Sequence, residues 1–100
     1  MKVYEGIRDK DGNLNVTVNG QPLDPRLDLW NHSPTGLECG YGGSGPAQLA
    51  LALLADCLSN DKTAVQLHQS FKWAVVACLP RSHWALTEAQ IRQAVNSLER

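Results

Sequence analysis

The residues whose types and spacing come nearest to a known chemistry lie in GYGGSGP, residues 40–46. Three of its glycines match the G-x-G-x-x-G pattern of dinucleotide-binding loops, and Asp61 follows where a ribose-binding acid would stand. A glycine-rich turn at the start of a helix can also bind an anion, because its free backbone N–H groups carry partial positive charge. The candidate anion-binding residues are Gly42, Gly43, Ser44 and Gly45.

The sequence around this segment argues against three specific motifs. A dinucleotide fold needs a second parallel strand where a second helix is expected here. A P-loop needs Lys-Ser or Lys-Thr after its last glycine, where Pro46-Ala47 stand, and Pro46 also replaces the last glycine of a serine-nucleophile elbow. Three interpretations remain open: a bend that only shapes the backbone, a phosphate or nucleotide site at a helix N-terminus, and a backbone platform for a protein partner.

The histidines and cysteines do not form a recognisable metal or catalytic motif. His32, His68, His83 and Cys39, Cys57, Cys78 include no pair at C-x-x-C or H-x-x-x-H spacing, so we predict no metal site and no cofactor. His68 lies on an apolar helical stripe, where a hydrogen-bonded core histidine is expected. A Cys–His nucleophile formed by Cys39 and His32 is the alternative, but no catalytic residue is assigned.

Trp73 is a large aromatic residue on the polar side of the helix predicted for residues 62–79. One explanation is that it packs against the N-terminal sheet or the loop that carries Trp30. The other is that it anchors a protein partner, since exposed aromatic residues are enriched at contact hot spots. The candidate partner-contact residues are Trp73, Gln69 and Trp30.

Composition limits the class of partner. Nine basic and ten acidic residues give this chain of 100 residues a formal net charge of −1, and the charges are scattered. Nucleic acids and anionic membranes are usually bound through concentrated basic patches, so neither is expected as the primary partner. No apolar run reaches the ~20 residues of a membrane span, no secretory signal is recognised, and the three cysteines suit a reducing compartment. We therefore expect a single cytoplasmic domain, residues 1–100.

The elements that must position these residues can be read from periodicity. Alternating apolar and polar residues predict strands over residues 3–8 and 14–18, and Asn19-Gly20 suits a type I′ turn into a short edge strand at 21–23. Residues 37–41 are predicted as a final strand that leads into the glycine segment.

Three helices are predicted in the second half of the chain. The first covers residues 46–58 and is apolar on nearly all sides, so it should be central. The second covers residues 62–79, and the third begins at the capping box of residues 87–90. This order predicts an α+β domain: a small antiparallel N-terminal sheet of three or four strands with three C-terminal helices packed on one face.

Several long segments carry a resemblance to a known family. GYGGSGPAQLALALLADCL, together with KVYEGIRDKDG, LDPRLDLWNHSPTG and FKWAVVACLP, resembles the small family catalogued as domain of unknown function 6166, and the likeness covers nearly the whole chain. The family occurs in bacteria, archaea and their phages and plasmids. The resemblance therefore implies a cytoplasmic protein, often carried by a mobile element, and it implies no activity.

Two classes of function are expected from these observations. The first is a non-enzymatic protein-interaction module, an accessory or inhibitor protein of a phage or other mobile element that acts on a bacterial protein assembly such as a defence complex. The alternative is a phosphate- or nucleotide-binding or catalytic domain that uses the Gly40–Pro46 loop for a small anion.

Overall fold

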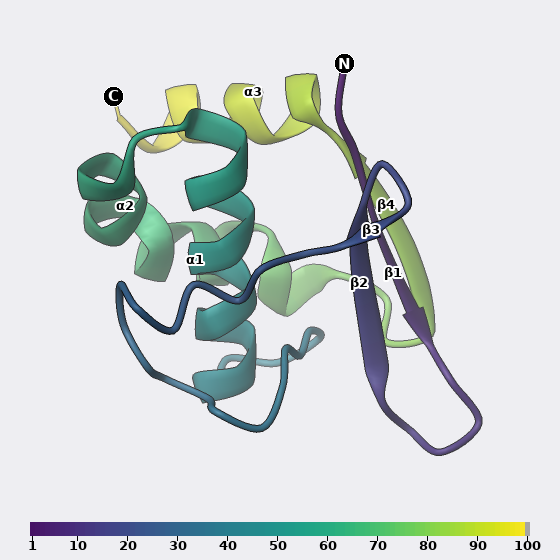
Figure 1. Ribbon diagram of the computed structural model, residues 1–100. Helices are drawn as coiled ribbons and strands as arrows, with labels where there is room; N and C mark the ends of the chain where they lie inside the picture. The colour runs from purple at the N-terminus through teal and green to yellow at the C-terminus, as the bar shows by residue number, and fades with distance from the viewer. Residues whose placement is uncertain (100) are drawn as a thin grey trace.

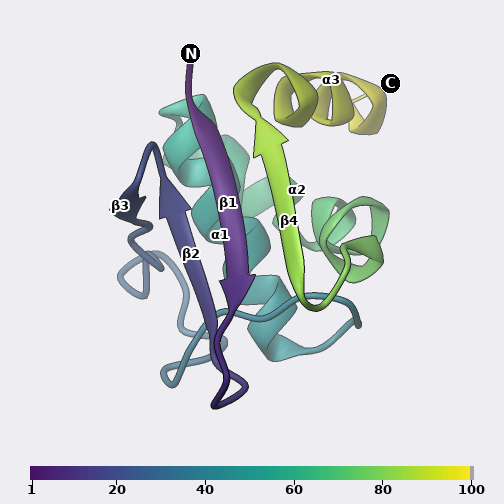
Figure 2. The same cartoon turned by 90° about the vertical axis from the view of Figure 1, so that its right-hand side faces the viewer.

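The computed structural model describes residues 1–99 and consists of a sheet with helices against one of its faces (Figure 1 and Figure 2). Strand β1 (Val3–Arg8) pairs antiparallel with β2 (Leu14–Val18) on one side and with β4 (His83–Thr87) on the other. The short strand β3 (Gln21–Pro22) extends the β2 edge, so the strand order is β3-β2-β1-β4. The predicted α+β class is confirmed.

The turn between β2 and β3 follows from local chemistry. Asn19 and Gly20 have φ angles of 49° and 83°, the two positive values for which an Asn-Gly pair is favoured. The side chain of Asn19 also accepts a hydrogen bond from the backbone N–H of Val3 at 2.8 Å. The turn therefore holds β2 and β3 in register with the beginning of β1.

The fourth strand corrects one prediction. Residues 37–41, predicted as a strand, have no strand structure, and the fourth strand is instead β4, from a segment for which no strand was predicted. Gly6 in β1 makes room for β4, because a Cβ there would lie 2.3 Å from the Trp84 ring. Gly40, with a φ of +84°, bends the chain where the predicted strand would have continued.

Helix α1 (Ser44–Leu58) occupies the centre of the molecule (Figure 1). Twelve of its 15 residues are buried, which confirms the prediction of a helix enclosed on nearly all sides. The sheet covers one side, and helices α2 (Asp61–Ala74) and α3 (Glu88–Leu98) cover the others. Burial of this apolar surface is the main source of stability in such a domain.

The boundaries of the other helices follow their capping residues. The Asn60 side chain caps α2, and Thr87 and Gln90 form the predicted capping box of α3. The predicted second helix was too long, because α2 ends at Ala74 and a short 3-10 turn, η1 (Val76–Cys78), replaces its last part. In residues 1–99, no helix has both the length and the apolar character needed to cross a bilayer.

Candidate functional site

The glycine segment forms a bend that passes close beneath neighbouring side chains. Gly42 lies against the ring of Trp73, since a Cβ on Gly42 would lie 2.1 Å from Trp73 Cη2. A Cβ on Gly45 would lie 2.7 Å from Glu38 Cβ. Two of the glycines are therefore required for close approach, which agrees with the interpretation that the segment shapes the backbone.

The bend leads into a helix start that lacks side-chain capping. Gly43 is the N-cap of α1, no side chain caps it, and the first turn contains no acidic residue. Within residues 1–99, the backbone N–H groups of residues 42–45 donate to no protein acceptor. The N-terminus of α1 therefore presents free donors and the positive end of the helix dipole.

Three exposed aromatic side chains come from segments that contact the first turns of α1, and together we call them the aromatic surface. Trp30, Tyr41 and Trp73 keep 51%, 45% and 61% of their area exposed. The Trp73 ring lies on the glycine bend, and Tyr41 lies next to Gly43. Gln69 is exposed on α2, one helical turn before Trp73.

A pair of histidines joins Trp30 to α2. The Trp30 and His32 rings are stacked with centroids 5.0 Å apart, and His32 Nε2 lies 2.9 Å from His68 Nε2. His68 is 1% exposed, and its Nδ1–H donates to the Val65 carbonyl at 2.6 Å. In the neutral pair, Nε2 of His68 must therefore accept a hydrogen bond from His32. The expectation that His68 is a hydrogen-bonded core histidine is confirmed.

Gln48 holds the Trp30 loop against α1. It is fully buried in an otherwise apolar helix, where an unpaired amide would be costly. Its Oε1 accepts hydrogen bonds from the backbone N–H groups of His32, at 2.8 Å, and Ser33, at 3.2 Å. Its Nε2 donates to the Pro25 carbonyl at 2.6 Å. One side chain thus satisfies three backbone groups and positions the loop that carries Trp30.

The burial of Lys72 was not predicted from the sequence. Its side chain is only 7% exposed, and its Nζ lies over the Trp73 ring, 4.4 Å from the centroid. Arg81 repeats the arrangement over Tyr41 at 5.8 Å. Two cations thus flank the aromatic surface through cation–π contacts. Helical spacing places Lys72 one turn after His68, a signal that could have indicated its burial.

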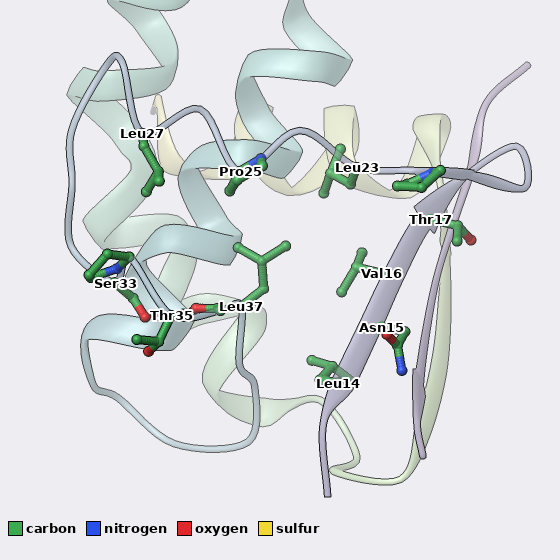
Figure 3. Close-up of a pocket in the computed structure, with 13 residues that line it drawn as sticks. Leu14, Asn15, Val16, Thr17, Leu23, Pro25, Leu27, Ser33, Thr35 and Leu37 are labelled. Carbon is green, nitrogen blue, oxygen red and sulfur yellow. Dashed lines mark hydrogen bonds between the residues drawn. The ribbon is translucent and has the colours of Figure 1, made fainter. Parts of the chain in front are cut away.

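An apolar pocket of about 460 Å³ lies elsewhere, between β2 and the loop that follows β3. Figure 3 shows Val16, Leu23 and Leu37 among the side chains around its central space. None of its 13 lining residues is titratable. The pocket therefore offers shape and apolar surface but no group for acid–base or nucleophilic chemistry.

A second, more polar pocket of about 720 Å³ borders the start of α1 and contains two carboxylates, Asp9 and Glu38. Both are already committed to other groups. Glu38 forms a two-pronged ion pair with Arg8, at 3.0 and 2.8 Å, which lowers the pKa of its carboxyl. Hydrogen bonds from the Asn13 backbone and the Asn15 side chain lower the pKa of Asp9. Both carboxylates are therefore ionised at neutral pH and are poor proton donors.

The alternative Cys–His nucleophile is not assembled. Cys39 is fully buried, burial raises the pKa of its thiol, and its Sγ–H points to the Pro80 carbonyl. His32 faces His68 instead. Among residues 1–99, no three His, Cys, Asp or Glu side chains gather as a metal site would require.

Comparison with known proteins gives one result. No curated protein and no solved structure matches this chain. A family model matches residues 4–97, which is nearly the whole chain. The matched range contains the glycine bend and the three residues of the aromatic surface. The chain therefore belongs to the family of unknown function DUF6166.

Proposed function

We propose that this protein is a non-enzymatic interaction module that docks a protein partner on the aromatic surface. The observation that carries the proposal is the exposure of Trp30, Tyr41 and Trp73 on segments that contact the first turns of the central helix. Exposed Trp and Tyr residues are enriched where proteins contact one another, because a large rigid side chain buries much area at little entropic cost. Gln69 adds an adaptable polar contact beside Trp73.

The charges around the aromatic surface support a partner with an acidic rim. Lys72 and Arg81 lie over the aromatic rings, and neither forms an ion pair with a residue in the range 1–99. A partner carboxylate beside these rings would be favoured by charge complementarity. The net charge of −1 for the whole chain favours a protein over a nucleic acid as the partner.

The biological setting that we propose follows from the family resemblance. The protein acts in the cytoplasm as an accessory or inhibitor protein of a phage or other mobile element, and its partner is a bacterial protein assembly such as a defence complex. The motive is that neither the apolar pocket beside β2 nor the polar pocket at the start of α1 offers a free acid, base or nucleophile, whereas the aromatic surface is accessible.

Photo-crosslinking tests this proposal at single-residue resolution. A photoreactive phenylalanine derivative at Gln69, beside Trp73, should capture one discrete partner in bacterial lysate. The same group at Gln93, exposed on α3, should not capture it. Adding Trp73→Ala should abolish capture, whereas Ile7→Ala, which removes another exposed apolar side chain, should leave it unchanged.

Two results would contradict the proposal. One is equal capture from positions 69 and 93, and the other is capture that survives Trp73→Ala in a variant whose circular dichroism shows an intact fold.

A further inference from the structure

Strand β2 has an open edge beyond the short strand β3. The backbone groups of Asn13 and Asn19, which flank β2, bond toward β1, so those of Leu14 and Val16 point to the opposite side. On that side β3 pairs with the end of β2, and the Leu23 N–H donates to the Val16 carbonyl at 3.0 Å. Within residues 1–99, the N–H groups of Leu14 and Val16 and the Leu14 carbonyl have no hydrogen-bond partner. The edge therefore offers donors and an acceptor to one more strand.

The apolar pocket lies along this open edge (Figure 3). Leu14 and Val16 line it from one face of the sheet, and Asn15 lines it from the other. A pocket lined from both faces of a strand reaches around the edge of that strand. Residues 33–37 form the opposite wall. The volume of about 460 Å³ lies within the roughly 300–1,000 Å³ of ordinary ligand sites, so there is room for an apolar side chain of a bound segment.

The charges along the edge are all at one end. No residue that lines the apolar pocket carries a charge. The polar pocket adjoins it, because Leu14 and Leu37 are among the residues that line both. Of the two carboxylates in the polar pocket, Glu38 is bound by Arg8, whereas the exposed, ionised Asp9 forms no ion pair within residues 1–99. An occupant that complements both pockets is apolar along the edge and basic beside Asp9.

We propose that this edge binds an extended peptide segment of a partner protein, which adds to the sheet as a strand beside β2. The segment runs antiparallel to β2, where β3 would continue past Leu23, and its backbone pairs with Leu14 and Val16. An apolar side chain of the segment enters the pocket, and a Lys or Arg that follows it lies beside Asp9. β2 contains no charged residue or proline of the kind that protects exposed edges. The site does not rest on the proposed docking function, because a strand beside β2 need not contact Trp73.

A blocked hexapeptide, acetyl-Thr-Val-Thr-Leu-Thr-Lys-amide, tests the site in two-dimensional NMR. Titration should shift the amides of Leu14 and Val16 saturably. It should also slow their exchange with deuterated solvent at least about tenfold, since each N–H gains a hydrogen bond. The same peptide N-methylated at its central Thr and Leu, one of which must face β2, should bind at least about tenfold more weakly.

Matched variants test the edge and the charge separately. Leu14→Pro removes one edge donor without removing a hydrogen bond to β1, whereas Leu14→Val keeps that donor. The proline variant should bind the peptide at least about fivefold more weakly, and the valine variant should stay within about twofold of the native protein. Asp9→Asn should weaken binding by about two- to fivefold. Asp11→Asn, at an exposed carboxylate outside both pockets, should not change it.

Several outcomes would overturn the site. The first is the absence of a saturable shift in the native protein across the millimolar range of peptide, which needs no variant. Shifts without slower exchange of Leu14 and Val16 would assign the pocket to a small apolar ligand instead. Slow exchange in the peptide-free protein that increases with protein concentration would assign the edge to a second copy of the chain. Equal affinity of the native and a folded Leu14→Pro protein would also contradict the proposal. Crosslinking at Gln69 uses no peptide, so failure of this site and failure of partner docking can be told apart.

Discussion

The two ends of helix α1 differ in how their polar groups are satisfied. At the C-terminal end, Asp56 Oδ1 accepts hydrogen bonds from the hydroxyl of Tyr4, at 2.7 Å, and from Lys2 Nζ, at 3.0 Å. The Cys57 carbonyl accepts one from Arg92 at 2.9 Å. At the N-terminal end, the amides of residues 42–45 have no such partner within residues 1–99.

The C-terminal end of α1 is built for stability, and binding at the N-terminal end is our proposal. Buried polar groups in folded proteins are nearly always hydrogen-bonded, and the C-terminal end follows that rule. Burial and the bond to Asp56 raise the pKa of Tyr4, so its hydroxyl stays protonated and donates. Unpaired donors and exposed aromatic rings stabilise the fold less than the hydrogen bonds at the C-terminal end do. Proteins commonly keep such groups at functional sites, at some cost in stability.

The largest predicted effect concerns the side chain that holds the N-terminal end together. Gln48→Leu should destabilise the protein by about 3 kcal/mol, because three backbone groups lose their buried partner. It should also free the Trp30 loop. Urea unfolding measures the first effect, and hydrogen exchange at His32 and Ser33 measures the second. The control Gln66→Leu, at an exposed position of α2, should stay within about 0.5 kcal/mol; a similar loss there would contradict the assignment.

The next effect tests the C-terminal end. Asp56→Ala should cost about 2 kcal/mol, since it leaves the buried Tyr4 hydroxyl without an acceptor and breaks the ion pair with Lys2. Asp61→Ala removes an exposed carboxylate whose partner, Arg26, keeps Asp28, so it should cost at most about 1 kcal/mol. Thermal unfolding of both variants compares them directly, and equal losses would mean that this end is not specially stabilised.

A smaller effect should appear as a pH dependence at the N-terminal end. Burial, His68 and Lys72 lower the pKa of His32 below its ordinary value of 6.5, so the folded protein binds fewer protons here than the unfolded chain. His32 therefore contributes stability that is present above pH 6.5 and is lost as the pH falls below it. Urea unfolding between about pH 7.5 and pH 5 should show this loss. His32→Asn should flatten the curve in that window, and an unchanged slope would refute the assignment.

The smallest effect on stability is expected at Trp73. The side chain is 61% exposed, so Trp73→Ala should change the free energy of unfolding by less than about 1 kcal/mol, although it removes the ring that lies on Gly42. Partner capture should nevertheless be lost. Thermal unfolding paired with the crosslinking assay separates the two effects. A large loss of stability would mean that the Trp73 side chain stabilises the fold, which would contradict its assignment to the proposed docking surface.

Sequence reasoning succeeded where the signal is local. The Asn19-Gly20 turn, the Thr87–Gln90 capping box and the enclosure of α1 depend on residues a few positions apart. It failed for β4 and for the end of α2. The first depends on pairing with β1 from the other end of the chain, and the second on the Gly40 N–H that donates to the Val76 carbonyl at 3.1 Å.

The sequence by itself determined the α+β class, the central apolar helix and the glycine bend, because hydrophobic period, turn residues and caps act within one element. Only the tertiary structure decided what surrounds that bend. It brought Trp73 onto Gly42, buried Lys72 beside that ring and placed His32 against His68, 36 positions away. Those contacts depend on the close packing of α2 and the Trp30 loop around α1, and no periodicity within a single element records that packing.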